Sequence, residues 1–269
     1  MNYGKISKLA QDSTVTADEV KEILLAYNIG KKPLAKLLSW GETTIIRYIE
    51  GDIPTSEYSQ KLRQIKDDPN YYYDLLLKNQ DKLTNVAFKK SKKAVLNIIM
   101  KSKINLIAQY IINRANGEIT PKWVQGILFY SQVISLGTTG RELFEEECTE
   151  SYNDMPYLNL YESMKKNGIK VIDINVDSIS KKERDIIDCV YETFEWYGPK
   201  AIRAINAMES LDYITEGSLF TNKSIPMEVL KTEYTAIFEK YNVSHYRDFT
   251  VYTHKRLKEA LAQNIIKRI

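Results

Sequence analysis

Four polar side chains that can form hydrogen bonds with nucleic acid lie within six residues of one another: Glu42, Thr43, Thr44 and Arg47. Carboxylate, hydroxyl and guanidinium groups reach base edges or phosphates when the helix that carries them lies in a major groove of DNA. Two cations, Lys32 and Lys36, come shortly before them, at positions typical of contacts to the phosphate backbone. These six residues are the candidate DNA-binding residues.

The segment that must position these side chains, residues 31–50, has the spacing of a helix-turn-helix. A small residue, Ala35, lets two helices approach closely, while Ser39 occupies a turn position that usually holds glycine. The apolar residues fall where such a pair buries its side chains: Leu34, Leu38, Trp40, Ile45 and Tyr48. An ordinary pair of helices in a bundle would show the same spacing, so that interpretation stays open.

Residue types that perform catalysis or bind metals occur without a matching pattern. The two histidines, His245 and His254, are nine positions apart, which is not the spacing of a metal-binding helix. The two cysteines, Cys148 and Cys189, form no recognisable pair and are read as reduced thiols. Neither a phosphate-binding glycine loop nor a nucleophile elbow is present. We therefore expect no enzyme, no metal and no cofactor.

Composition and charge indicate a globular protein with two different halves. Of its 269 residues, 43% are hydrophobic and 27% charged, and no apolar run is long enough for a transmembrane helix. We expect a cytoplasmic protein without a membrane partner. Residues 1–103 contain 18 Lys+Arg and 12 Asp+Glu, against 20 and 23 in residues 104–269. A basic front half fits nucleic-acid binding, although lysines scattered over solvated faces would give the same balance.

The signals for secondary structure are almost all helical. Thr16 with Glu19 and Ser180 with Glu183 have the spacing of capping boxes, and Thr120 precedes a first-turn proline. Residues 169–176 alternate between apolar and polar types and fit a short strand or an extended edge. We predict a mainly α fold with at most a short strand or two.

The helix-turn-helix segment also resembles a known family. Residues 38–51, followed by Pro54-Thr55-Ser56 and then by Asp68-Pro69, are similar to the helix-turn-helix domain of MqsA-type antitoxins and related phage repressors. In that family the stretch is a DNA-reading helix pair with a supporting helix behind it. The family's zinc module contains C-x-x-C pairs, and this chain has none, so the resemblance implies no metal.

The second half resembles the SocA-like, or Panacea, domain of toxin–antitoxin and prophage loci. Residues 124–132, Val-Gln-Gly-Ile-Leu-Phe-Tyr-Ser-Gln, are similar to the apolar L-x-K-L-L-Y-x-x-Q helix of that family. Further matches lie at residues 107–112, 119–120, 142–147, 156–161, 186–191 and 225–234. Two departures stand out. Gly126 replaces the lysine of the helix, and the usual Ala-Trp and Gly-Pro pairs fall on Glu150-Ser151 and Asp154-Met155.

Together the two resemblances imply three segments and a function. Residues 1–70 would form a helix-turn-helix DNA-binding domain, 71–103 a helical connector, and 104–269 a SocA-like or Panacea domain with a C-terminal helical extension. The chain would be an antitoxin that neutralises a cognate toxin protein by direct binding and represses its own promoter, as a homodimer. The aromatic residues expected to be exposed and to bind the toxin are Tyr152, Tyr157, Trp196 and Tyr197.

Two other functions fit the same sequence. The chain could be a phage or host transcriptional regulator whose second domain has a partner unrelated to any toxin. It could also be a proteolytic adaptor, since some proteins that resemble this domain deliver partners to a protease. A small toxic reading frame beside the gene would favour the antitoxin.

Overall fold

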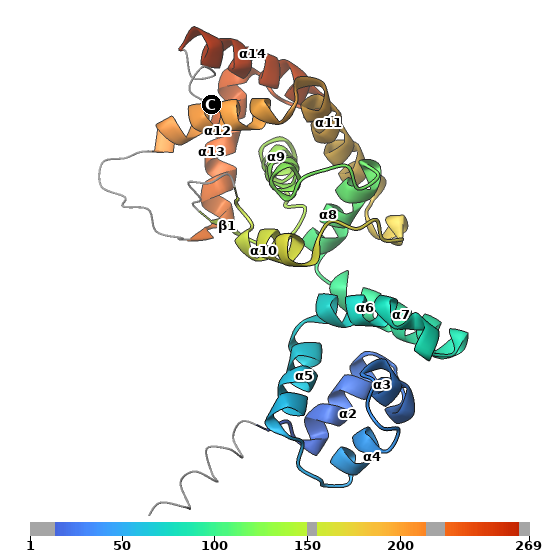
Figure 1. Cartoon of the computed structure of the whole chain (residues 1–269). Coiled ribbons are helices and arrows are strands. Elements are labelled where there is room, and N and C mark those ends of the chain that lie inside the picture. The colour runs from blue at the N-terminus through green and yellow to red at the C-terminus, as the bar shows by residue number, and fades with distance from the viewer. Residues whose placement is uncertain (1–13, 150–154, 214–223, 264–269) are drawn as a thin grey trace, which may run out of the picture. The chain divides into compact units, whose positions relative to one another are not determined.

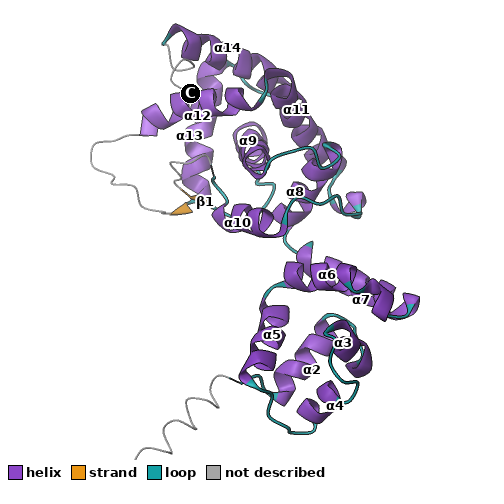
Figure 2. Ribbon diagram, in the orientation of Figure 1, coloured by secondary structure: helices purple, strands orange, loops and turns teal. Residues whose placement is uncertain are grey.

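The computed structural model describes residues 14–149, 155–213 and 224–263, and the chain divides into two compact units at Lys101/Ser102. The described residues are 72% helical and contain thirteen α-helices and one two-stranded antiparallel sheet (Figure 2). The prediction of a mainly α fold with a short strand or two is confirmed. Each unit is considered by itself below.

The described part of unit 1, residues 14–101, contains six α-helices and a short 3-10 helix (Figure 1). They are α2 (Ala17–Ala26), α3 (Lys31–Leu37), α4 (Thr44–Ile49), α5 (Ser56–Asp67), α6 (Pro69–Lys78), η1 (Gln80–Lys82) and α7 (Asn85–Ile99). The predicted capping box opens α2: the Glu19 amide donates to the Thr16 hydroxyl, and the Glu19 carboxylate accepts from the Thr16 amide.

Helices α6 and α7, which lie in the range expected to connect the domains, belong to unit 1. The Tyr72 ring of α6 stacks on the Tyr27 ring of α2, with centroids 3.8 Å apart. The Tyr27 hydroxyl donates to the carbonyl oxygen of Ile65 at the end of α5. Both tyrosines are buried, and burial raises the pKa of Tyr27 to about 12. These aromatic contacts join α2, α5 and α6 into one core.

Where the structure describes it, unit 2 contains seven α-helices, two 3-10 helices and both strands. They are α8 (Lys103–Arg114), α9 (Pro121–Thr139), β1 (Cys148–Thr149), α10 (Leu158–Asn167), η2 (Val176–Ser178), α11 (Lys181–Tyr197), α12 (Pro199–Tyr213), β2 (Ser224–Ile225), α13 (Met227–Tyr241), η3 (Tyr246–Asp248) and α14 (Phe249–Ala262). The predicted caps are present, because the Thr120 hydroxyl accepts from the Trp123 amide and Ser180 forms a capping box with Glu183.

Helix α9 is the core of unit 2. Figure 1 shows it end-on, with α8, α10, α11 and α13 around it, and all four of these helices pack against it. Most of its residues are buried, and an α-helix that is apolar on all sides is stable only when other elements enclose it. A Cβ on Gly126 would lie 2.7 Å from two side-chain carbons of Ile202 in α12. The lysine that the family has at this position therefore has no room here.

Residues 169–175 form an irregular extended segment without strand pairing. Amide side chains of α8 hold it: Gln109 donates to the carbonyl oxygen of Lys170, and Asn113 donates to that of Ile172. The Asn113 side-chain oxygen also accepts from the Ile172 amide. Side chains thus take the place of a partner strand, which explains the alternation of buried and exposed residues without a sheet. The sheet that does form pairs Cys148 with Ile225 and Thr149 with Ser224.

Candidate nucleic-acid interface

The turn between α3 and α4 is a tight helix C-terminus. The Trp40 amide donates to the Ala35 carbonyl oxygen at 2.8 Å, and the Ser39 amide donates to that of Lys36 at 3.0 Å. This is the Schellman arrangement, which requires a left-handed residue at its centre. Ser39 has a φ of 60° and supplies that conformation without being glycine. Although the sequence has serine at this position in place of the usual glycine, the turn has the same left-handed conformation.

Apolar packing fixes α4 beside α3. Ala35 and Ile45 are fully buried, so the two helices approach closely at the position predicted for the small residue. The Trp40 ring stacks on Tyr58 of α5 with centroids 4.1 Å apart, and Tyr48 meets the same Tyr58 edge-on. These contacts anchor the turn to α5 and set the direction in which α4 leaves it.

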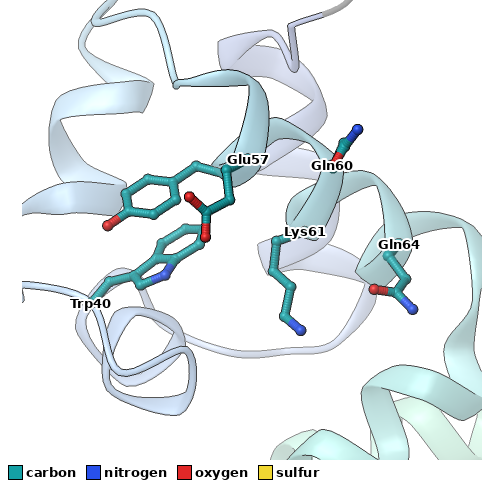
Figure 3. A pocket seen from close by; sticks show the side chains of 6 residues that line it. Trp40, Glu57, Gln60, Lys61 and Gln64 are labelled. Carbon is teal, nitrogen blue, oxygen red and sulfur yellow. The ribbon is translucent and has the colours of Figure 1, made fainter.

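A surface groove of about 300 Å³ lies beside this aromatic stack. Figure 3 shows Trp40 at one end of it and Lys61 and Gln64 of α5 along it, with Glu57 close to the Trp40 ring. The Lys61 ammonium lies 4.8 Å from the centre of the Tyr71 ring. The groove therefore combines an aromatic wall with polar side chains from α5.

Arg47 points away from the core and is bound to an acidic neighbour. Its Nε donates to Asp52 Oδ2 at 2.7 Å, and the Asp52 amide donates to the Arg47 carbonyl oxygen at 3.0 Å. The Arg47 side chain is 67% exposed. Ion pairs this exposed are weak, so a phosphate or a guanine can compete for the guanidinium.

Glu42 is bound in the same way to the preceding helix. Its carboxylate lies 3.0 Å from the Lys36 ammonium and 3.6 Å from that of Lys32. The hydrogen bond from Lys36 and the charges of both lysines lower the pKa of Glu42. In this arrangement the carboxylate offsets one of the two positive charges carried by the lysines that are predicted to contact the DNA backbone.

The two threonines complete the opening of α4. Thr43 is exposed and precedes the helix with helical backbone angles, while Thr44 is half-buried in its first turn. All six candidate DNA-binding residues thus lie on α3, on α4 or directly before α4, with ion pairs joining three of them.

The aromatic residues predicted to bind a partner differ in exposure. Trp196 is 84% exposed on α11, and the neighbouring Tyr197 hydroxyl is hydrogen-bonded to Nδ1 of His254. The prediction that Tyr157 is exposed is wrong. Its ring is buried edge-on against Phe144 because its backbone amide is bound by Gln125 of α9. Tyr152 lies outside the described residues.

A buried polar cluster in unit 2 was missed from the sequence. The Glu209 carboxylate on α12 accepts hydrogen bonds from the hydroxyls of Tyr130, Tyr234 and Tyr252, which lie on α9, α13 and α14. Burial raises the pKa of Glu209, and the tyrosine hydrogen bonds oppose that shift. The four residues are at most 3% exposed. No local pattern signals such a cluster, because its members are scattered over more than 120 positions.

Among the described residues, no group of three or more His, Cys, Asp or Glu side chains is placed to hold a metal ion, and Cys148 and Cys189 are free thiols. Among the described helices no single one is long and apolar enough to cross a bilayer, and only α7 and α8 taken together meet those criteria.

Comparison with known proteins gives no match: no family model, curated protein or solved structure is similar to the chain. Its function is therefore inferred below from the residues, their geometry and the resemblances described above.

Proposed function

We propose that the chain is a DNA-binding antitoxin. In this proposal, unit 1 binds the promoter of its own operon as part of a homodimer, and unit 2 binds and neutralises a cognate toxin protein in the cytoplasm. The chain performs no chemistry of its own. It acts by occlusion, covering the promoter against transcription and the toxin against its target.

One observation carries the DNA-binding half of the proposal. Buried and exposed residues lie on different faces of α4: Ile45 and Tyr48 are buried, whereas Arg47, and Thr43 directly before the helix, are exposed. A recognition helix needs this division, because its inner face must hold it on the supporting helices while its outer face enters the major groove. Lysines on α3 lie beside that outer face, where the DNA backbone would pass.

The toxin-binding half rests on the resemblance of residues 104–240 to the SocA-like, or Panacea, domain. The helical enclosure of α9, which contains residues 124–132 of the resemblance, is compatible with it. Exposed Trp196, with half-buried Tyr197 beside it, is the aromatic surface offered for the toxin.

The DNA-binding half is tested with the variant Arg47→Ala/Thr44→Ala. Each lost base or phosphate contact costs about 1–3 kcal/mol, so we expect the affinity for promoter DNA to fall on the order of 100-fold. The affinity is measured by gel retardation of the promoter fragment. A matched variant in unit 2, Arg203→Ala/Thr232→Ala, replaces exposed residues of the same types and should bind normally. Normal retardation by the first variant would show that α4 does not read the DNA.

The toxin-binding half is tested by co-expressing the chain with the product of the neighbouring gene. We expect the neighbour alone to stop growth, and the full chain to restore growth and co-purify with it. The Arg47→Ala/Thr44→Ala variant should restore growth equally well. A harmless neighbour that forms no complex would instead favour a transcriptional regulator, and degradation of the neighbour that depends on a protease would favour an adaptor.

A further inference from the structure

The excess positive charge of the front half does not lie in residues 1–70, the predicted DNA-binding domain taken as a whole. Residues 1–70 contain ten Lys+Arg and ten Asp+Glu, whereas residues 71–103 contain eight and two. From Lys82 to Gly117 the sequence contains no acidic residue at all. Helix α4, the candidate recognition helix, therefore belongs to a segment without net charge. The cations that could attract a polyanion lie on and around α7.

Packing within unit 1 determines which side of α7 faces outward. Ser91, Val95 and Ile99 are buried, and the Ser91 hydroxyl is 2.6 Å from the hydroxyl of Tyr72 on α6. The opposite side carries Lys89, Lys90 and Lys93, all exposed. At about 100° of rotation per residue, these three lysines fall within an arc of about 100° on the helix surface.

These three lysines have no anionic partner among the described residues. The cations near α4 differ, because Lys32, Lys36 and Arg47 are all ion-paired. Like charges three or four residues apart on a helix repel each other, so the spacing of Lys89, Lys90 and Lys93 destabilises an isolated α7. A polyanion bound along this face would remove that repulsion.

The lysine face is connected to the turn of the helix-turn-helix. Lys82, at the end of η1, donates to the Ser39 hydroxyl at 2.8 Å, and η1 packs against α3. Helix α7 begins three residues after Lys82 and packs on α6. The lysines are therefore held on the same compact unit as α4.

A membrane surface does not fit this helix. A helix that adsorbs to a bilayer inserts its apolar side, and the apolar side of α7 is already packed against α6. Duplex DNA presents phosphates at regular intervals and binds lysines without specific geometry. The exposed face of α7 thus has the chemistry of a phosphate-backbone contact.

We propose that Lys89, Lys90 and Lys93 form a second DNA contact, which binds the phosphate backbone outside the groove entered by α4. This inference rests on the proposed DNA-binding function. It assigns separate roles to two parts of unit 1. Helix α4 distinguishes sequences, and the lysine face of α7 supplies affinity that is independent of sequence.

The test uses the full-length variant Lys89→Gln/Lys90→Gln/Lys93→Gln, with the promoter duplex and a scrambled duplex of equal composition as probes. Affinity is measured by fluorescence anisotropy over a series of salt concentrations. Each lost phosphate contact reduces the slope of log K against log salt by about 0.9, so we expect a reduction of about 2–3. The affinities for both duplexes should fall by the same factor, which leaves their ratio unchanged.

Two control variants separate charge from folding. Lys89→Arg/Lys90→Arg/Lys93→Arg keeps the charge and should retain the wild-type slope. Lys165→Gln/Lys181→Gln/Lys182→Gln removes three exposed lysines of unit 2 and should also retain it. Circular dichroism of each variant shows that its helices are intact.

The proposed contact at α7 is contradicted if the glutamine variant keeps the wild-type slope of log K against log salt. It is also contradicted if the arginine variant loses as much affinity and slope as the glutamine variant. It is also overturned if the glutamine variant binds DNA normally but no longer co-purifies with the neighbouring gene product, since the lysines would then serve an acidic protein. Failure of the wild-type chain to bind either duplex would remove the proposed DNA-binding function itself.

Discussion

Ser39 shows how a single residue shapes the candidate interface. It occupies the left-handed conformation that ends α3, with a φ of 60°, and its hydroxyl accepts a hydrogen bond from Lys82. For a residue with a Cβ, this conformation costs roughly 1–2 kcal/mol, whereas glycine adopts it without that cost. The chain therefore places a strained residue at the point that sets the start of α4.

Replacing this residue should stabilise unit 1. We expect Ser39→Gly to raise the free energy of unfolding by about 1 kcal/mol, because the strain is relieved while only an exposed hydrogen bond is lost. Urea denaturation of the two proteins measures the difference. A variant that is less stable than the wild type would mean that the Lys82 contact contributes more than the strain costs.

Glu42 is the second residue whose role the geometry makes testable. Its carboxylate pairs with Lys32 and Lys36 and offsets part of their charge, which would otherwise attract phosphates. We expect Glu42→Gln to raise the affinity for any duplex several-fold and to steepen its salt dependence by up to about 0.9 per freed lysine. The measurement is anisotropy with promoter and scrambled DNA. A selective loss of promoter binding would instead assign Glu42 a direct contact with a base.

At the scale of elements, the central helix α9 depends on a glycine. A Cβ on Gly137 would overlap the ring of Phe238 on α13 and lie 3.3 Å from the Tyr234 carbonyl oxygen. Because the two helix backbones are held this close, the position has no space for a methyl group. The residues that precede it in α9, Val133 to Leu136, are already buried and cannot shift freely.

We therefore expect Gly137→Ala to destabilise unit 2 by about 1–3 kcal/mol, although alanine is the better helix former. Thermal unfolding followed by circular dichroism measures the change. Gly137→Ala/Phe238→Leu should recover part of the loss, since a smaller side chain makes room for the methyl group. Additive losses in the double variant would contradict the close approach.

The elements also show what could be predicted from the sequence. The caps at Thr16, Thr120 and Ser180 were predictable because a cap is formed by residues within one turn of each other. The alternation in residues 169–176 left a strand and an unpaired extended segment both open, because the groups that hold the segment, Gln109 and Asn113, are about 60 positions away. Local patterns record which face of a segment is buried, but not which part of the chain covers it.

The candidate site follows the same rule. The residues of α3 and α4 could be named in advance because the helix-turn-helix is a contiguous motif. The burial of Tyr157 could not, since it depends on Gln125 and Phe144 from other elements. Arg47 and Asp52 are close in the sequence, yet the sequence pattern alone did not predict their ion pair.

At the scale of the whole molecule, the response to acid combines two opposite effects. The pKa of Asp248 is lowered by hydrogen bonds from the backbone amides of His245 and Ser244, so the stability that this carboxylate contributes is lost as the pH falls through its folded pKa. Glu209 behaves in the opposite way, because burial raises its pKa. The folded chain then holds this proton more tightly than the unfolded chain, and protonation stabilises it.

Glu209→Gln isolates this effect, because it keeps the shape of the side chain and cannot titrate. As the pH falls from neutral through the raised pKa toward the ordinary value near 4.5, we expect wild-type unfolding temperatures to rise relative to the variant. Thermal unfolding of both proteins over this pH range gives the difference. A difference that is constant with pH would mean that Glu209 keeps an ordinary pKa in its tyrosine cluster.

Because neighbouring helices bury most of α9, the sequence of unit 2 divides into two parts that are under different constraints. A substitution in α9 must satisfy several neighbouring helices at once, so tolerated changes there are few. The outward faces of those neighbours, Trp196 of α11 among them, contact nothing that α9 requires. Related chains can therefore diverge in what they bind while the helix at the centre, and with it the fold, stays the same.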